Sequence, residues 1–245
     1  MRALVAGGGG FIGSRLVRVL LNNDWIVRVL DIQYGELVDC KDNLEFFGVG
    51  SDDLHGGVAD RNIVRQAVKG VDVVYHLALN WDGATWKHEV SLADLFDVNI
   101  RGTLNLLEEA KSGGVKHFLF ASSTAVYGDG NVEVVDEESV CKPELFEGDP
   151  GPAYTIMKLA TERLCLLYSS EHGLPVTVLR IGYVFEPPGE GEIHVKDVVQ
   201  AFILATLNSK AYGQIFNVTC EPIVSTRRIR EILDWKPKFT TRICR

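Results

Sequence analysis

The chain has 245 residues, 46% of them hydrophobic, and a formal net charge of -8 at pH 7. This length allows one substantial hydrophobic core, or one core with a small attached lobe. The negative charge and the lack of a long Lys/Arg run argue against nonspecific nucleic-acid binding, and no apolar run approaches the roughly 18 residues of a membrane span. We therefore expect a cytoplasmic protein with no nucleic-acid partner and no membrane contact.

In the first half of the chain, short apolar runs alternate with longer amphipathic segments. The apolar runs predict strands over residues 2–6, 25–31 and 71–79. The amphipathic segments predict helices over residues 14–23, 61–70 and 92–111. Asp60 stands where the N-cap of the second helix is expected, and Gly70 stands where that helix would end.

The same alternation continues in the second half. A strand over residues 115–123 is followed by a helix that begins near Ala153 and ends at Gly173, and two more strands are predicted over residues 175–182 and 213–219. Strands that are apolar throughout and are separated by helices indicate a parallel sheet covered on both faces. The predicted fold class is therefore α/β, with a doubly wound parallel sheet.

A glycine-rich turn lies between the first strand and the first helix. Gly7, Gly10 and Gly13 recur there at intervals of three residues. In such a position glycine permits a tight turn, a close approach of the backbone to a pyrophosphate, and close packing of helix on strand. The N-terminus of the helix adds free N–H groups that favour phosphate. This context predicts a dinucleotide site.

Asp31 ends the second predicted strand, where an acid commonly meets the adenosine ribose of a dinucleotide. Its carboxylate can accept both ribose hydroxyls and would repel a 2′-phosphate, so NAD is favoured over NADP. Arg15 and Arg28 are near in sequence, and either could instead accommodate a phosphate.

Tyr154 and Lys158 stand four residues apart on one predicted helix, just after a loop rich in Gly and Pro. Residues at this spacing are neighbours on a helix surface, so the pair could be structural or could transfer a proton. The spacing by itself does not decide between these alternatives.

Six motifs occur in order along the chain: GGGGFIG, HLAL, NIRGTLNLLEEA, FASSTAVYG, YTIMK and IHVKDVV. Together they resemble the extended short-chain dehydrogenase/reductase family, and within it the NAD-dependent nucleotide-sugar epimerases and dehydratases. The resemblance covers Met1 to about Asn217. It implies a Rossmann domain over residues 1–180 and a small, abbreviated substrate lobe over residues 181–245, interleaved with the last strands and helices.

The resemblance also implies roles for individual residues. Ser123, Tyr154 and Lys158 match the catalytic set of the family, and Ser123, Thr124 and Tyr183 match substrate-binding positions. The cofactor NAD would be bound by Gly7, Gly10, Phe11, Ile12, Gly13, Asp31, Ile32, Val58, Leu77, Ala78, Leu79, Asn99, Ser122, Tyr154, Lys158 and Ile181. Relatives also commonly dimerise through the two long helices, so we expect a homodimer. No metal-binding pattern is present.

The implied chemistry begins with a phenol whose pKa is ordinarily near ~10. A neighbouring lysine ammonium and an oxidised nicotinamide would both favour the phenolate. Tyr154 could then take a proton from a sugar hydroxyl while hydride leaves the same carbon, and Ser123 would hold the oxygen in line. Dehydratases of the family carry Asp-Glu after the catalytic Ser/Thr, whereas this chain has Thr124-Ala125. This difference favours epimerisation of a nucleotide-sugar, of the UDP-sugar 4-epimerase type.

Three departures from the family pattern keep other functions open. Gly57 replaces an aspartate that contacts adenine in relatives, and Tyr183 replaces an asparagine that often meets the nucleotide-sugar. The segment between Phe185 and Ile193 is shorter than in relatives by several tens of residues, so the substrate lobe is reduced or lacks loops. The alternatives are an NAD(P)-dependent reductase or dehydrogenase of a smaller alcohol or carbonyl, and a non-catalytic dinucleotide-binding protein.

Overall fold

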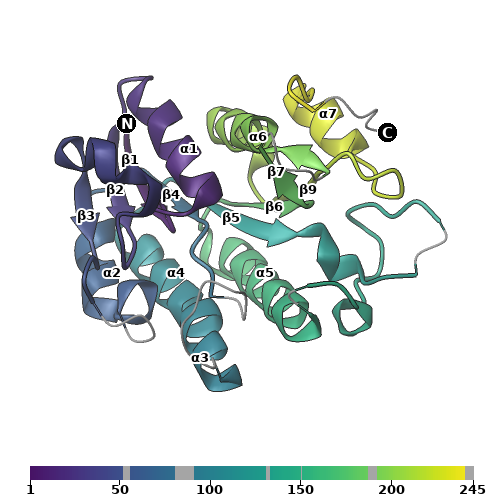
Figure 1. Ribbon diagram of the computed structural model, residues 1–245, viewed down its shortest axis with the longest axis horizontal. Helices are drawn as coiled ribbons and strands as arrows, with labels where there is room; N and C mark the ends of the chain where they lie inside the picture. The colour runs from purple at the N-terminus through teal and green to yellow at the C-terminus, as the bar shows by residue number, and fades with distance from the viewer. Residues whose placement is uncertain (52–55, 81–90, 131–132, 150, 187–191, 241–245) are drawn as a thin grey trace.

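The computed structural model describes residues 1–51, 56–80, 91–130, 133–149, 151–186 and 192–240 (Figure 1). Its centre is a seven-stranded sheet in which every pairing is parallel, in the order β3-β2-β1-β4-β5-β6-β9. The strands are β1 (Arg2–Ala6), β2 (Ile26–Leu30), β3 (Glu45–Phe47), β4 (Val73–His76), β5 (His117–Ser123), β6 (Val176–Ile181) and β9 (Gln214–Val218). The predicted fold class is confirmed.

Alternate residues of each strand belong to two separate cores. Ala3 and Val5 of β1 face one core, whereas Leu4 and Ala6 face the other, and all four are fully buried. Successive side chains of a strand point to opposite faces, so a strand covered on both sides must be apolar at every position. This requirement explains why the strands are visible in the sequence as continuous apolar runs.

Helices cover both faces of this sheet (Figure 1). One face carries α1 (Phe11–Leu21), α6 (Val195–Leu207) and α7 (Arg227–Leu233). The other carries α2 (Arg61–Val68), α4 (Gly102–Ser112) and α5 (Pro152–His172). Short 3-10 segments complete the chain: η1 (Gly35–Asn43), η2 (Gly57–Ala59), η4 (Thr124–Tyr127), η5 (Pro143–Leu145) and η6 (Ser209–Ala211). None of the helices in the described ranges is long and apolar enough to span a membrane.

Local sequence features account for several helix ends. The Asp60 carboxylate accepts hydrogen bonds from the backbone N–H groups of Asn62 (2.7 Å) and Ile63 (3.3 Å), so the predicted N-cap of α2 is confirmed. The long helix predicted over residues 92–111 is present, but it is interrupted. It runs through α3 (Leu92–Phe96), the π-helical turn η3 (Asp97–Arg101) and α4.

Two details of the sheet differ from the prediction. The edge strand β3 was not predicted, because three residues with one exposed Glu carry too little periodic pattern. The strand predicted over residues 71–79 is shorter, since β4 ends at His76 and the chain then passes beneath the glycine turn.

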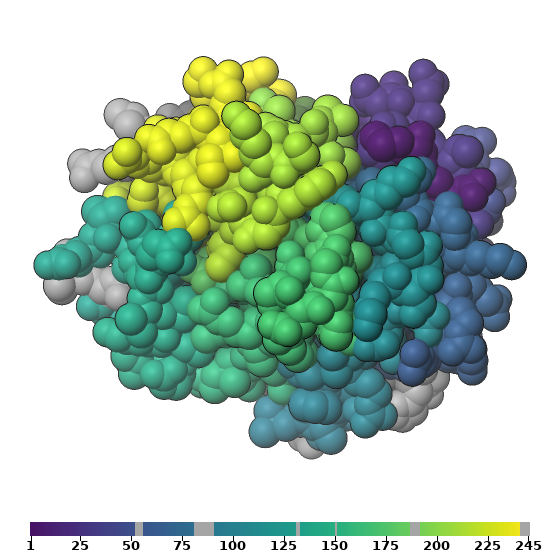
Figure 2. All heavy atoms as spheres, turned by 180° about the vertical axis from the view of Figure 1, so that it is seen from behind, coloured from purple at the N-terminus to yellow at the C-terminus, as the bar shows by residue number. Residues whose placement is uncertain are grey.

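Viewed from behind, the yellow C-terminal part and the purple N-terminal part lie on opposite sides of the molecule (Figure 2). A separate two-stranded sheet pairs β7 (Val184–Phe185) with β8 (Ile193–His194).

Candidate active site

The glycine turn lies between β1 and α1. β1 is the point in the sheet where the strand order changes direction, because β2 and β3 lie on one side of it and β4, β5, β6 and β9 on the other. Gly7 has φ +81°, and a Cβ atom there would lie 2.5 Å from the backbone nitrogen of Ala78. A Cβ on Gly13 would lie 2.1 Å from the carbonyl oxygen of Gly7. The fold itself therefore requires glycine at positions 7 and 13.

Gly10 is different, because a Cβ there would meet its nearest atom at 3.4 Å, an ordinary contact. It is the N-cap of α1, and no side chain caps the free N–H groups of that helix. Phe11 and Ile12 begin the helix. An uncapped helix N-terminus with an open approach is suited to a pyrophosphate, so the residues present fit a dinucleotide.

Asp31 is held directly beside this turn. Its carboxylate accepts hydrogen bonds from the backbone N–H groups of Gly9 (2.9 Å) and Gln33 (3.3 Å). Burial raises the pKa of Asp31 above its ordinary value, and these N–H groups act in the opposite direction. Arg15 pairs with Glu36 and Glu186, and so is not a free cation for a 2′-phosphate.

Arg28 is also paired, with Glu45 at 2.6 Å, and its Nη1 donates to two backbone carbonyl oxygens. The adenine side of the expected site is formed by Ile32, Gly57 and Val58. Gly57 has φ +55°, and its Cβ position lies 3.1 Å from Cγ2 of Ile32. Val58 is buried against Gly102 of α4.

Ser123, Tyr154 and Lys158 come together at the carboxyl end of β5. Ser123 is the last residue of β5 and pairs in register with Ile181, the last residue of β6. Tyr154 and Lys158 lie on successive turns of α5, and the Lys158 Nζ is 5.8 Å from the centre of the Tyr154 ring. The structure thus brings the three predicted catalytic residues to one place.

Burial dominates the protonation of this group. It raises the pKa of Tyr154 to about 12, although the hydrogen bond with Ser123 lowers it. Burial lowers the pKa of Lys158 to about 7, and its Nζ donates to the carbonyl oxygen of Ala121 at 2.6 Å. Without a bound cofactor Tyr154 is therefore a neutral phenol at pH 7, and added positive charge nearby would favour its phenolate form.

Asn99 lies in the π-helical turn η3 and clamps the loop after β4. Its Oδ1 accepts from the backbone nitrogen of Asn80 at 2.8 Å, and its Nδ2 donates to the backbone oxygen of Asn80 at 2.7 Å. The same Nδ2 is 3.8 Å from the sulfur of Met157, which precedes Lys158. Asn99 therefore connects the loop that contains Leu77, Ala78 and Leu79 to helix α5.

The side of the site expected to meet substrate contains Thr124, which is buried, and Tyr183, which is 70% exposed. Glu192 accepts hydrogen bonds from the backbone N–H of Tyr183 (3.0 Å) and from the Thr219 hydroxyl (3.1 Å). Burial, together with the carboxylates of Glu192 and Asp129, raises the pKa of Glu221 to about 7. Sequence reasoning did not identify these acids, because they come from three distant segments. Four residues that follow the HLAL motif, Trp81, Trp86, Lys87 and His88, could from the sequence either border the substrate or belong to a solvent-exposed loop, and they lie outside the described residues.

A buried ion pair joins β6 to α5 near the candidate catalytic residues, and sequence reasoning did not identify it either. Arg180 of β6 donates to both carboxylate oxygens of Glu162 on α5, at 3.0 Å and 2.6 Å, and both side chains are fully buried. The Ser122 hydroxyl donates to the same carboxylate at 2.9 Å. Arg180 also donates to the Tyr127 hydroxyl at 2.8 Å. Burial lowers the pKa of Arg180, but Glu162 more than offsets this effect and holds it above its ordinary value.

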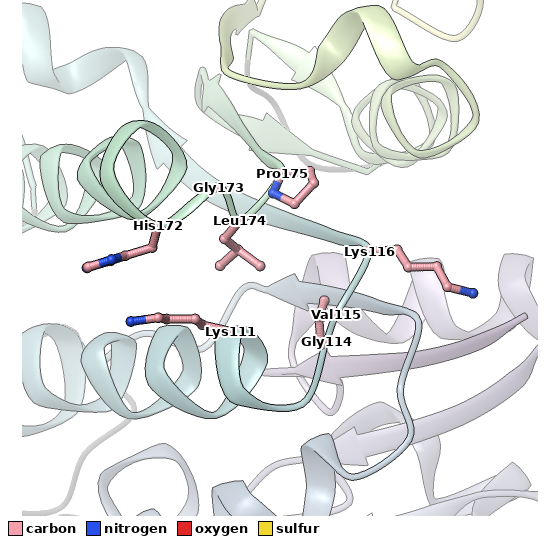
Figure 3. A pocket seen from close by; sticks show the side chains of 8 residues that line it. All are labelled: Lys111, Gly114, Val115, Lys116, His172, Gly173, Leu174 and Pro175. Carbon is pink, nitrogen blue, oxygen red and sulfur yellow. The ribbon is translucent and has the colours of Figure 1, made fainter.

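A hollow of about 400 Å³ lies elsewhere, between the C-terminal ends of α4 and α5 (Figure 3). Val115 and Lys116 precede β5, and Leu174 and Pro175 precede β6, so it lies at the amino ends of the strands. Ligands of doubly wound sheets bind outside the carboxyl ends. This hollow is therefore not part of the dinucleotide site.

Known proteins are similar to this chain in sequence and in fold. The model of the NAD dependent epimerase/dehydratase family matches residues 3–193. An uncharacterised protein of Sinorhizobium fredii is 35% identical over 179 residues, which cover 73% of this chain and 40% of that protein. A UDP-N-acetyl-alpha-D-glucosaminuronate decarboxylase of Bacillus cytotoxicus is 28% identical over 94% of this chain and 78% of its own length. The chain thus spans less than half of the first of these relatives.

A solved structure is also similar over nearly the whole chain. The crystal structure of a UDP-glucose 4-epimerase from Thermotoga maritima has a TM-score of 0.79 and is 24% identical, covering 98% of this chain and 94% of that chain. Fold and glycine turn together define an α/β dinucleotide-binding protein. The chain belongs to the NAD-dependent epimerase/dehydratase family, and the expected cofactor NAD is the cofactor of that family.

Proposed function

We propose that this protein epimerises a nucleotide-sugar, with a UDP-sugar 4-epimerase type of reaction. The observation that carries the proposal is the convergence of Ser123, Tyr154 and Lys158 at the carboxyl end of β5, beside the glycine turn. Bound NAD supplies a hydride acceptor that can return the same hydride. In this proposal residues 181–245 provide the substrate lobe.

The side chains of the site have separate tasks in this reaction. Tyr154 Oη takes the proton of the sugar hydroxyl as its carbon is oxidised, and returns it when the carbon is reduced from the other face. The Ser123 side chain acts to lower the pKa of the Tyr154 phenol, which indicates that the two groups are neighbours, so Ser123 Oγ can hold the substrate oxygen next to the phenol. Lys158, with its pKa lowered to about 7, can gain a proton as negative charge develops nearby.

The residues after Ser123 disfavour dehydration. Thr124 and Ala125 follow it in η4, and neither can act as a carboxylic acid. Among the described acids Glu221 has a pKa suited to proton transfer at neutral pH, because its pKa is raised to about 7. It follows β9, however, which is two strands away from β5 in the sheet. Simple oxidation and re-reduction at one carbon needs no second acid.

A second candidate function is an NAD-dependent oxidoreductase of a smaller alcohol or carbonyl. The short connection between β7 and β8 favours it, because residues 186–192 are all that separates the two strands. In this alternative the same Tyr154 and Ser123 would act, but the hydride would stay on the reduced cofactor, which would then be released. Net reduction of NAD by an alcohol, in the absence of any nucleotide-sugar, would distinguish it from epimerisation.

The test is NMR spectroscopy of the purified protein with NAD and a panel of UDP-, dTDP- and GDP-sugars. We expect interconversion of C4 epimers by the wild-type protein and none by Tyr154→Phe, which removes only the hydroxyl. Calorimetry with NAD on the same variant provides the control: the glycine turn, Asp31 and Lys158 remain, so NAD should still bind, weakened by no more than the loss of one hydrogen bond. Absence of turnover across the panel, with NAD still bound, would reject the epimerase proposal.

We further propose that the protein forms a homodimer through α3, α4 and α5. Large apolar side chains on α3 and α5 face water in the single chain: Leu92 and Phe96 on one, Ile156 and Leu167 on the other. Apolar patches of this kind commonly mark protein interfaces. Light scattering should give twice 27.1 kDa for the wild-type protein, and the monomer mass for Phe96→Glu. A monomeric wild-type protein would reject the proposal.

A further inference from the structure

The most unusual polar group beside the glycine turn is the carboxamide of Asn80. The residue is only 1% exposed, yet neither Oδ1 nor Nδ2 has a hydrogen-bond partner among the residues that the structure describes. Buried polar atoms in native proteins are nearly always paired, and each exception requires an explanation. We propose that Asn80 is a cofactor-binding residue whose carboxamide hydrogen-bonds the hydroxyls of the nicotinamide-side ribose of NAD.

The backbone of Asn80 is fixed, so the position of its side chain is not accidental. The two hydrogen bonds from Asn99, at 2.8 Å and 2.7 Å, occupy both backbone polar groups of Asn80. Asn99 itself lies in a π-helical turn, an irregularity that often occurs at functional sites. A buried and unpaired carboxamide on a backbone held this firmly is preorganised for a ligand rather than adapted to the protein interior.

The surroundings of Asn80 indicate which part of the dinucleotide it meets. Two residues earlier, the backbone of Ala78 lies directly beneath Gly7, where the pyrophosphate is expected. On the other side, Asn99 approaches Met157, the neighbour of Lys158 on α5. Asn80 therefore lies between the pyrophosphate turn and the catalytic lysine. The part of NAD that spans this interval is the ribose that carries the nicotinamide.

The chemistry of the two groups is complementary. A carboxamide offers one acceptor oxygen and two N–H donors. Each ribose hydroxyl both donates and accepts, so a cis-diol can satisfy both ends of the carboxamide. The adenosine ribose is excluded, because Asp31 is placed for it at the end of β2. The inference rests on NAD binding and not on the proposed epimerisation, so its test uses binding alone.

The test compares three ligands by calorimetry: NAD, ADP-ribose and ADP. ADP lacks the second ribose, whereas ADP-ribose retains it without the nicotinamide. For Asn80→Leu we expect affinity for NAD and ADP-ribose to fall about tenfold, the effect of one or two lost hydrogen bonds, and affinity for ADP to stay unchanged. The melting temperature of the ligand-free variant should not fall, because an unpaired polar group has been removed.

Asn208→Leu is the matched control. Its carboxamide is paired, with Nδ2 donating to the Ile232 carbonyl oxygen at 3.2 Å and Oδ1 accepting from Lys210 N at 3.0 Å. This variant should lose thermal stability and keep its affinity for all three ligands. Asn80→Ser, which retains a hydroxyl, should recover part of the affinity and replaces Asn80→Leu if the latter fails to fold.

Three outcomes would overturn the inference. Unchanged affinity for NAD and ADP-ribose would mean that the Asn80 carboxamide binds only a structural water. An equal loss for ADP would indicate general damage to the glycine turn. A loss for NAD but not for ADP-ribose would assign Asn80 to the nicotinamide ring and not to its ribose.

Discussion

Replacing Arg180 by methionine would leave the Glu162 carboxylate buried without its main partner. Both side chains are fully buried, and three Arg180 N–H groups donate within 3.0 Å, two to Glu162 and one to Tyr127. The polar groups that remain near Glu162 are the Ser122 hydroxyl at 2.9 Å and the exposed guanidinium of Arg163 at 3.8 Å. Methionine fills much of the arginine volume, so the change tests the charge rather than a cavity.

The expected loss follows from the charge that would be left behind. Removal of one partner of a buried ion pair typically costs about 3–5 kcal/mol. The Ser122 hydroxyl and the Arg163 guanidinium remain beside the Glu162 carboxylate, so the expected loss lies toward the lower end of this range. We therefore expect Arg180→Met to lose about 3–4 kcal/mol of unfolding free energy at pH 7.

The assay is urea unfolding of wild type and variant at pH 7, followed by tryptophan fluorescence. Arg227→Met is the matched control, because Arg227 pairs with Glu231 on the surface and its loss should have no measurable effect. Adding Glu162→Gln to Arg180→Met should recover part of the lost stability. A loss below about 1 kcal/mol for Arg180→Met, or no recovery on adding Glu162→Gln, would refute the reasoning.

Three further predictions concern the site. Gly10→Ala should keep the wild-type melting temperature and lose NAD affinity, whereas Gly13→Ala should lose both, because a Cβ contacts Gly7 O at an ordinary 3.4 Å from position 10 but clashes with it at 2.1 Å from position 13. Equal melting temperatures of the two variants would contradict this prediction. Asp31→Asn should weaken NAD binding about tenfold and reduce the ratio of the affinity for NAD to the affinity for NADP, both measured by calorimetry. An unchanged affinity ratio would exclude a contact between Asp31 and the adenosine ribose. Burial lowers the pKa of Lys158 to about 7, so between pH 7 and 10 the unfolded chain binds a proton at Lys158 that the folded protein does not bind. The stability of the wild type relative to Lys158→Met, measured by scanning calorimetry, should therefore rise from pH 7 to 10. A stability difference that is constant over this pH range would show that Lys158 is not desolvated.

Much of the fold can be predicted from short stretches of the sequence. A strand covered on both faces must be apolar at every position, so β1, β4 and β5 are visible as continuous runs. Asp60 and the glycine turn likewise act on residues that are their immediate neighbours in the chain. The spacing of Tyr154 and Lys158 belongs to one helix, and the motif resemblance connected it to Ser123.

Other features depended on partners far away in the chain. Glu162 and Arg180 look like ordinary surface residues in the sequence, and only the packing of α5 against β6 buries both and makes each necessary to the other. The acids around Glu221 come from three segments, and their mutual effect arises only where those segments meet.

The amino-acid sequence by itself determined the strands, the glycine turn, the cofactor class and the candidate catalytic residues, because each depends on short-range pattern or on a motif. Only the tertiary structure decided how these residues are held. Asn99 binds the backbone of Asn80, nineteen positions away, and the buried carboxamide of Asn80 has no hydrogen-bond partner among the residues that the structure describes. No local pattern predicts such a contact, because the free energy of a buried polar group depends on which distant atoms surround it.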